Sequence, residues 1–153
     1  MELPYDMDKS VFYGRGPIEN YIDRKESQSV GIYEQTADEQ FYPYIRPQET
    51  GTKSDVRWWR QHNGSGAGFC LTAAGYFNAS ALHYSITDLD EGEEKAQRHA
   101  PEVAKSKYTE LCFDHAQFGL GGVNSWGAWP LSQHRLGYKD MTFKFRITPL
   151  DEK

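Results

Sequence analysis

Two tryptophans stand in a glycine-rich stretch at residues 117–130. The glycines allow turns with positive φ, so this stretch is expected to be a loop that carries two large flat rings. The ring of Trp126 suits stacking on the apolar face of a sugar, and Asn124 and Ser125 beside it offer hydrogen bonds to hydroxyls. The stretch therefore predicts a carbohydrate-contacting loop. The alternative is a packed turn whose rings belong to the core, as most tryptophans do.

No other residue pattern indicates a catalytic or metal centre, so we expect neither a metal site nor a cofactor in this chain. Glu49 has no acidic partner nearby in sequence, which argues against a carboxylate pair for glycoside hydrolysis. His99 lacks a second histidine at ligand spacing, which favours a surface or capping role. Cys70 and Cys112 lie in apolar runs, where free buried thiols are expected. No motif selects a general acid or base among the histidines His62, His83, His99, His115 and His134.

Arg15 lies in the turn 14–17, which contains two glycines and a proline, and Glu19 and Asn20 follow it. Long polar side chains on a rigid turn can reach a partner surface or a sugar. They can also form an internal pair between arginine and a carboxylate that holds the turn in place. We favour the internal pair.

The elements that position these residues are predicted to be strands. Apolar and polar residues alternate most clearly in 107–115, which leads directly into the tryptophan stretch, and in 141–148. The glycines of 63–68 indicate a hairpin turn, and prolines at 43 and 47 make 44–46 a connection or an edge. Ser85 begins a helical run that extends through 91–98. The predicted strands are 10–13, 29–34, 55–61 with its two tryptophans on opposite faces, 69–73, 76–85, 107–115 and 141–148.

Many short strands with glycine and proline between them predict an all-β fold, an antiparallel β-sandwich, formed by residues 1–153 as one domain. The chain is rich in aromatic residues, with 10 Tyr, 8 Phe and 4 Trp. Its net charge of -5 argues against binding to nucleic acid or to a membrane surface. No apolar run approaches the length of a membrane span, and no signal-peptide pattern opens the chain, so its location stays open.

Four motifs occur in order along the chain: YGRGPIENY at 13–21, YIRPQETG at 44–51, DVRW at 55–58 and GLGGVNSW at 119–126. In this order they resemble the C-terminal domain, also called the small chain, of glycoside hydrolase family 2 β-galactosidases. The resemblance covers nearly the whole chain, but only the later part of that domain, without its opening strands and without the catalytic barrel. It implies a fragment of a galactose mutarotase-like supersandwich.

The resemblance also implies a function. The parent enzyme hydrolyses terminal β-D-galactosides, and both of its catalytic glutamates lie outside this stretch, so the chain itself is expected to be non-catalytic. Trp126 matches a tryptophan that family members direct toward the active-site opening, while Trp129 is expected to be a packing residue. The implied partners are the β-galactoside and the catalytic barrel of the parent chain. Missing strands leave apolar surface uncovered, which predicts association into a homo-oligomer.

Two other functions stay open at the level of sequence. The chain can be a free-standing carbohydrate-binding or aldose mutarotase-like protein, which requires a general acid and a base facing the anomeric carbon. It can also be a purely structural sandwich that mediates contacts between subunits. Measurement of mutarotation of α-galactose separates the first alternative from a β-galactosidase domain.

Overall fold

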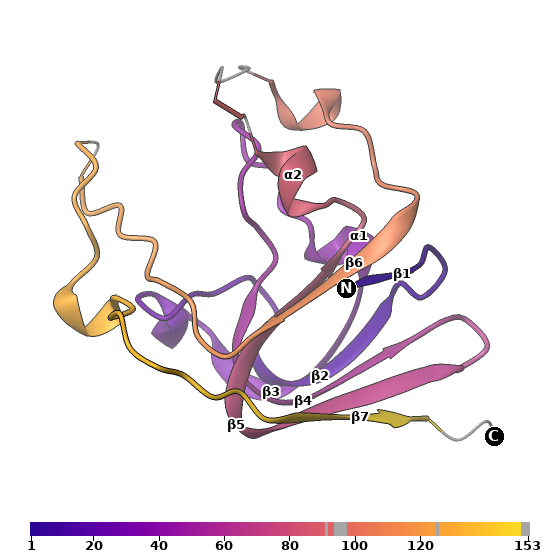
Figure 1. The fold of residues 1–153 in the computed structure, drawn as a ribbon. Coiled ribbons are helices and arrows are strands. Elements are labelled where there is room, and N and C mark those ends of the chain that lie inside the picture. Colours follow the sequence, from indigo (N-terminus) through magenta and orange to yellow (C-terminus); the bar gives the residue numbers. More distant parts are fainter. Residues whose placement is uncertain (91, 94–97, 125, 151–153) are drawn as a thin grey trace.

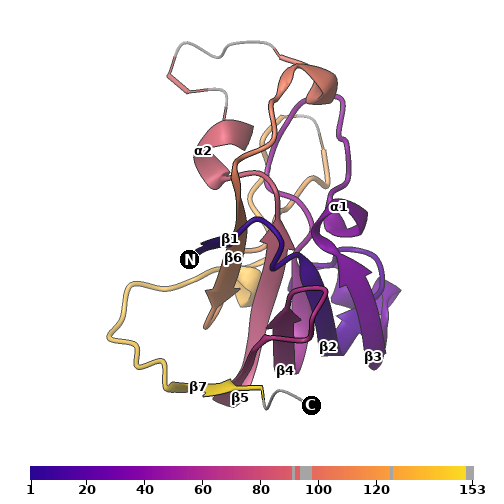
Figure 2. The same ribbon diagram turned by 90° about the vertical axis from the view of Figure 1, so that its right-hand side faces the viewer.

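A computed structural model of the chain describes residues 1–90, 92–93, 98–124 and 126–150. Its strands form an antiparallel sheet with the order β1-β6-β5-β4-β2-β3, and β7 pairs with β5. Figure 1 shows this curved sheet, and Figure 2 shows β6, β5, β4, β2 and β3 side by side. The prediction of an all-β, antiparallel, sandwich-like fold is confirmed. The strands are β1 (Glu2–Pro4), β2 (Lys9–Gly16), β3 (Ser29–Thr36), β4 (Lys53–His62), β5 (Gly68–Leu82), β6 (Tyr108–Asp114) and β7 (Phe145–Pro149).

The helices of the described residues are single turns in the connections between strands. Capping boxes start the two α-helical turns, with Thr36 and Glu39 at α1 and with Ser85 and Asp88 at α2. The predicted helix start at Ser85 is therefore confirmed, whereas residues 91 and 94–97 of its continuation lie outside the described residues. No helix that the structure describes is long and apolar enough to cross a membrane. The helical turns are α1 (Ala37–Gln40), α2 (Ile86–Leu89), η1 (Lys25–Ser27), η2 (Ala100–Glu102) and η3 (Ser132–His134).

The two faces of the sheet differ in chemistry. Residues paired directly across antiparallel strands point to the same face. One row of such pairs is apolar, and its members Phe12, Trp59 and Leu71 belong to the buried core: Tyr33, Phe12, Trp59, Leu71 and Ile147. Trp58 lies in the neighbouring row on the opposite face, as the sequence predicts, while Trp59 is fully buried. We call the face that carries Trp59 the inner face and the face that carries Trp58 the outer face.

The strand β5 corrects two predicted boundaries. The predicted strands 69–73 and 76–85 are one strand, because register shifts between Lys53 and Trp58 of β4 absorb the residues between them. The predicted strand 141–148 starts too early. Its pairing with β5 begins at Phe145, opposite Ala73, and continues to Pro149, opposite Phe69. Farther along, Asn78–Leu82 of β5 pair with β6 instead.

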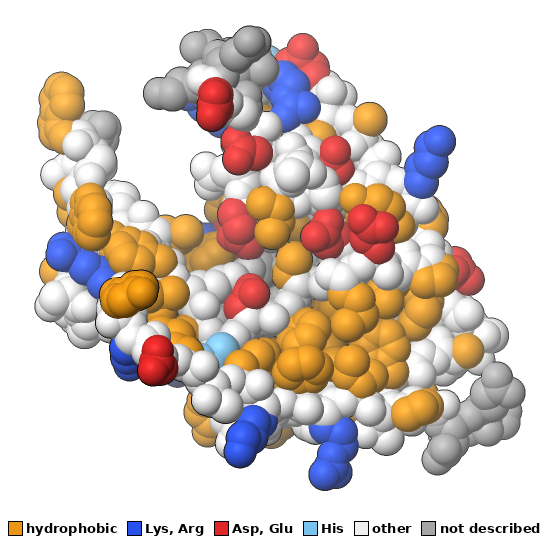
Figure 3. Space-filling view, viewed as in Figure 1, with side chains coloured by type: hydrophobic (Ala, Val, Ile, Leu, Met, Phe, Trp, Pro, Cys, Tyr) orange, Lys and Arg blue, Asp and Glu red, His pale blue; other side chains and the backbone are white. Residues whose placement is uncertain are grey.

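Part of the inner face is open to solvent. Hydrophobic side chains gather over the area between β6 and β7 in Figure 3. Phe145 and Ile147 of β7 are 49% and 45% exposed, and the strands that the structure describes form no second sheet over them. An exposed apolar area of this kind on a sheet commonly marks an interface. The partly buried side chains that extend the area are Leu3, Phe69, Ala73, Phe113 and Phe143.

We expect the isolated chain to self-associate through this apolar area, because pairing two copies removes apolar surface from water. Substitution of Ile147→Lys places a charge in the area and should shift the chain toward the monomer in gel filtration over a concentration series. Ile45→Lys is the control, because Ile45 is exposed in the connection before β4 and lies outside the area. A wild-type chain that elutes as a monomer at every concentration would contradict the prediction.

Candidate functional site

The predicted sugar-contacting loop forms an arm, which we define as residues 117–136. It follows β6 and extends away from the sheet, on the left of Figure 1, before the chain returns to β7. Gln117 begins the arm, and its amide nitrogen donates to Asp114 Oδ2 at 3.0 Å and to Thr52 Oγ1 at 3.5 Å. The arm is therefore attached at its root to β6 and to the residue that precedes β4.

Asp23 fixes the base of the arm. Its Oδ2 accepts a hydrogen bond from the backbone N–H of Gly121 at 2.8 Å, and the backbone N–H of Gly119 donates to the carbonyl of His134 at 2.8 Å. Glycine is required at 119 because a Cβ there would lie 2.9 Å from the same Asp23 oxygen. Gly121 has φ +72, a conformation that other residues rarely adopt. The hydrogen bond between Gly119 and His134 therefore joins the outgoing and the returning segments of the arm, and Asp23 holds the outgoing segment.

Trp126 stands at the tip of the arm and is 92% exposed. Its ring stacks on no aromatic ring of the described residues. The side chain of Asn124 shapes this tip, because its Oδ1 accepts from the backbone N–H of Trp126 at 2.9 Å and of Ala128 at 3.4 Å. Ser125, the third predicted site residue, lies outside the described residues. Asn124 thus serves the turn through its oxygen, while the Trp126 ring is presented to solvent.

Trp129 differs from Trp126 in its contacts. Its ring meets the ring of Phe118 edge to face, with centroids 5.8 Å apart, and the guanidinium of Arg135 lies 5.3 Å from its centroid. The side chain of Arg135 also donates to the carbonyl of Pro130 at 2.6 Å. Trp129 is 68% exposed, yet it packs within the arm. The contact of Trp126 with a sugar stays a prediction.

Arg15 forms the internal pair that the sequence favours. Its Nε donates to Asp55 Oδ2 at 2.8 Å, and Lys25 donates to the other Asp55 oxygen at 2.9 Å. Glu26 accepts from the outer nitrogen of Arg15 at 3.1 Å. Asp55 itself has φ +51, which is uncommon for a residue with a side chain. The guanidinium therefore holds the turn after β2 against the start of β4.

Glu19 is the buried centre of a second network around the same turn. Its Oε2 accepts from Thr50 Oγ1 and from the backbone N–H of Gly51, both at 2.8 Å. Its Oε1 accepts from Arg24 at 2.5 Å and from the Tyr44 hydroxyl. Burial by itself raises the pKa of Glu19, but these donors outweigh burial and hold the pKa below its ordinary value. Glu19 thereby ties the connection 41–52 to the turn after β2.

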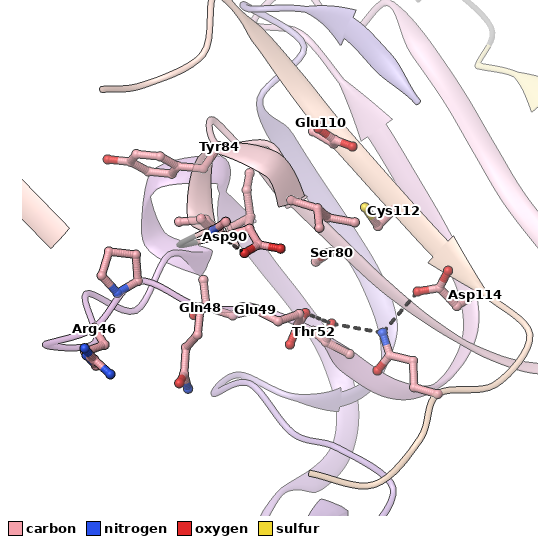
Figure 4. A pocket seen from close by; sticks show the side chains of 17 residues that line it. Arg46, Gln48, Glu49, Thr52, Ser80, Tyr84, Asp90, Glu110, Cys112 and Asp114 are labelled. Atoms are coloured by element: carbon pink, nitrogen blue, oxygen red, sulfur yellow. Dashed lines mark hydrogen bonds between the residues drawn. The ribbon is translucent and has the colours of Figure 1, made fainter. Parts of the chain in front are cut away.

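A pocket of about 630 Å³ opens next to the root of the arm and is shown in Figure 4. Gln117 links two of its walls, because it contacts both Thr52 and Asp114. Glu49, another lining residue, accepts from Thr52 Oγ1 at 2.7 Å. Loss of solvent around the carboxyl group of Glu49 raises its pKa, and the negative charges of Glu19 and Asp114 raise the pKa further. The rest of the residue is open to solvent, so that Glu49 as a whole counts as exposed. Glu49 thus has acidic neighbours in space that its sequence surroundings do not reveal.

The remaining candidates for chemistry have structural roles. Burial raises the pKa of the Cys112 thiol to about 11, which keeps it protonated, and both cysteines are free. His99 stands at the N-cap position of η2, and its backbone N–H donates to Glu102 at 2.7 Å, so the predicted capping role is confirmed. No group of three or more acidic, histidine or cysteine side chains suited to a metal ion occurs in the part of the chain that the structure describes.

Sequence reasoning missed the residues that hold the arm. Asp23 lies 98 residues before Gly121, and Thr52 lies 65 residues before Gln117. No local pattern connects such pairs, because their proximity depends on the pairing of strands between them. The one available signal is that Asp23 closely follows the motif at 13–21, which places it at the same turn as Glu19.

A curved antiparallel sheet with a strand-anchored aromatic arm places the chain among all-β, sandwich-like domains. Residues 1–147 match the family model of the β-galactosidase small chain, and the chain belongs to this family. It is 35% identical over 144 residues to a β-galactosidase of Priestia megaterium, covering 94% of this chain and 13% of the relative. A β-galactosidase of Lactobacillus delbrueckii subsp. bulgaricus is 41% identical over 128 residues, 83% of this chain and 12% of the relative. The chain thus spans about an eighth of the length of these relatives.

We expect Glu19→Gln to destabilise the chain by about 1–3 kcal/mol at about pH 7, because the amide weakens acceptance from four donors and brings a new donor against them. The folded-state pKa of Glu19 lies below its ordinary value of 4.5, so its contribution is full above that value and is lost as the pH falls through the folded pKa. The difference in unfolding free energy between wild type and Glu19→Gln should therefore shrink in acid.

Urea unfolding at neutral and acid pH measures this difference. Glu34→Gln is the matched control, because Glu34 is an exposed carboxylate of β3. It should change stability by less than about 0.5 kcal/mol. A Glu19→Gln effect that is as small as the control effect, or that grows in acid, would show that the ionised Glu19 carboxylate does not stabilise the fold.

Proposed function

We propose that the chain is a non-catalytic domain of a β-galactosidase that hydrolyses terminal β-D-galactosides, and that its arm contributes Trp126 to the sugar site. Membership in the β-galactosidase small-chain family supports the enzyme class. The small share of the relatives that the chain covers supports a domain within a longer enzyme. In this proposal the catalytic carboxylates belong to another part of the parent protein.

The exposure of Trp126 is the observation that carries the sugar-contact role. Trp126 is 92% exposed, so its indole ring does not contribute the stabilisation that a buried ring would give the fold. The base of the arm is nevertheless held by Asp23 and by the backbone hydrogen bond between Gly119 and His134. A ring on a well-anchored support suits stacking on a sugar, because little conformational freedom is lost on binding. Asn124 keeps its amide NH₂ group available while its oxygen holds the turn, so it can donate to a hydroxyl.

The described carboxylates favour a scaffolding role over catalysis. Retaining glycoside hydrolysis uses a nucleophilic carboxylate and an acid/base carboxyl about 5 Å apart. Glu19 and Asp55 are each held by several donors in the networks around the turn after β2. Glu49 and Asp114 line the pocket, but each is engaged with a neighbouring side chain. Trp126 on the arm, by contrast, is 92% exposed and stacks on no aromatic ring of the described residues.

In the parent enzyme, Trp126→Ala should raise KM about 2- to 12-fold, which corresponds to the loss of one stacking contact of about 0.5–1.5 kcal/mol. The fold should be unaffected, because the ring packs on nothing in the described structure. Trp126→Phe should recover part of the loss. Steady-state kinetics with a β-galactoside, together with the melting temperature of each variant, test this expectation.

Trp129→Ala is the matched control on the same arm. Its ring contacts Phe118 and Arg135, so its loss should affect the stability of the arm more than KM. The proposed role of Trp126 is wrong if Trp126→Ala leaves the kinetics unchanged. It is also wrong if Trp129→Ala raises KM by the same factor while Trp126→Ala lowers the melting temperature.

The isolated chain should neither hydrolyse a β-galactoside nor accelerate mutarotation of α-galactose. Hydrolysis requires the catalytic carboxylates of the parent enzyme, and none of the described histidines lines the pocket of about 630 Å³ that contains Glu49. Release of a chromogenic aglycone and polarimetry measure the two activities. Turnover that Glu49→Gln abolishes would assign catalysis to the pocket. Mutarotation by the purified chain would instead support the free-standing mutarotase-like alternative.

A further inference from the structure

The outer face of the sheet carries a band of arginines and aromatic rings that the proposed sugar role does not use. Two neighbouring rows of directly paired residues each run across five strands. The first row contains Ile32, Tyr13, Trp58, Thr72 and Arg146. The second row contains Glu34, Val11, Arg60, Cys70 and Thr148. We call the surface formed by these two rows, together with Arg57 and Tyr76, the arginine face.

Arginines cover the aromatic rings of this surface. The guanidinium carbon of Arg57 lies 4.2 Å from the centroid of Tyr76 and 5.2 Å from that of Tyr13. The guanidinium carbon of Arg60 lies 5.1 Å from the centroid of Trp58. Cation–π contacts of this kind hold a flexible side chain in one place without neutralising its charge. The arginine face therefore presents positive charges whose side chains are already ordered.

Among the described residues, Arg57, Arg60 and Arg146 form no ion pair with a carboxylate. Arg60 and Arg146 are exposed, and neither forms an ion pair among the described residues. Arg57 donates to the backbone carbonyl of Asp55 and not to a carboxylate. The chain as a whole has a net charge of -5. A group of arginines without carboxylate partners on one face therefore differs in sign from the chain as a whole. Glu34 of β3 is the acidic member of the second row, opposite Val11.

The same geometry disfavours a sugar as the ligand. A sugar stacks on an open ring face, but here guanidinium groups occupy the faces of Trp58, Tyr13 and Tyr76. What remains accessible is the N–H edge of each guanidinium, which matches a carboxylate in bidentate geometry. A shallow recess of about 300 Å³ between β5 and β7 is flanked by Lys144 and Arg146, and two cations at one recess suit an acidic side chain.

We infer that the arginine face docks an acidic protein surface, with Arg57, Arg60 and Arg146 binding carboxylates of the partner. Trp, Tyr and Arg are the residues enriched at the energetic centres of protein interfaces, and all three occur here on one sheet face. A protein partner fits this surface because it spans five strands, whereas small ligands prefer enclosed cavities. The docking is independent of Trp126 and of sugar.

Binding of a short fluorescein-labelled peptide of glutamate and glycine to the full chain, followed by fluorescence anisotropy, tests this inference. The double variant R60Q/R146Q should raise Kd at least about tenfold at low salt, because it removes two carboxylate partners without removing a buried contact. The control K107Q/K139Q removes the same charge from exposed lysines outside the face and should change Kd less than about twofold. Arg57→Lys keeps the charge but loses the planar fork, and should weaken binding about threefold or more.

Each other outcome overturns the inference. Absence of peptide binding shows that the face has no affinity for carboxylates on a polypeptide. Equal weakening by R60Q/R146Q and K107Q/K139Q shows a diffuse field and no docking surface. Polygalacturonate supplies carboxylates on a sugar chain, and tighter binding of it than of the peptide, lost in R60Q/R146Q, would make the face a polysaccharide site.

Discussion

The fold depends on one long strand, β5, which pairs with three others. Along one side it pairs with β4, and along the other it pairs with β7 at Phe69–Ala73 and with β6 at Asn78–Leu82. The chain must therefore leave the sheet after β6 and return to it at β7, and the arm lies in this excursion. Val56 pairs with Phe77 and Trp58 with Thr72, so the β5 residues between Thr72 and Phe77 bulge from the ladder, where β5 changes from β7 to β6 on its other side. The position of Trp126 relative to the sheet is a consequence of this arrangement.

Carboxylates hold the loops that the sheet leaves unpaired. Asp23 supports the base of the arm, Glu19 ties the connection 41–52 to the turn after β2, and Asp55 anchors Arg15. A carboxylate suits this task because it accepts several hydrogen bonds at once, including bonds from backbone N–H groups that would otherwise be unsatisfied. Arg15 and Glu19 of the motif at 13–21 thus help to maintain the shape of the domain.

The sheet has two faces with different uses. The inner face buries Phe12, Trp59 and Leu71, and its exposed part on β7 is apolar. The outer face carries exposed arginines stacked on aromatic rings. Burial of an apolar surface against a partner is favourable in many relative orientations. Guanidinium groups held in place, in contrast, bind carboxylates in a particular geometry. The domain therefore combines a surface suited to burial with a surface suited to specific recognition.

The sequence by itself determined most of the strands and the family. Alternation within 107–115 predicts β6, and the opposite faces of Trp58 and Trp59 follow from the two-residue period of a strand, because both depend only on neighbouring residues. Ordered motifs sufficed to indicate the β-galactosidase small chain, and the glycines of 117–130 sufficed to indicate a loop. Tertiary structure alone decided that Asp23 supports Gly121, that Glu49 lies near Asp114 and that arginines cover the outer rings. These contacts join residues far apart in the chain, and only the pairing of strands brings them together.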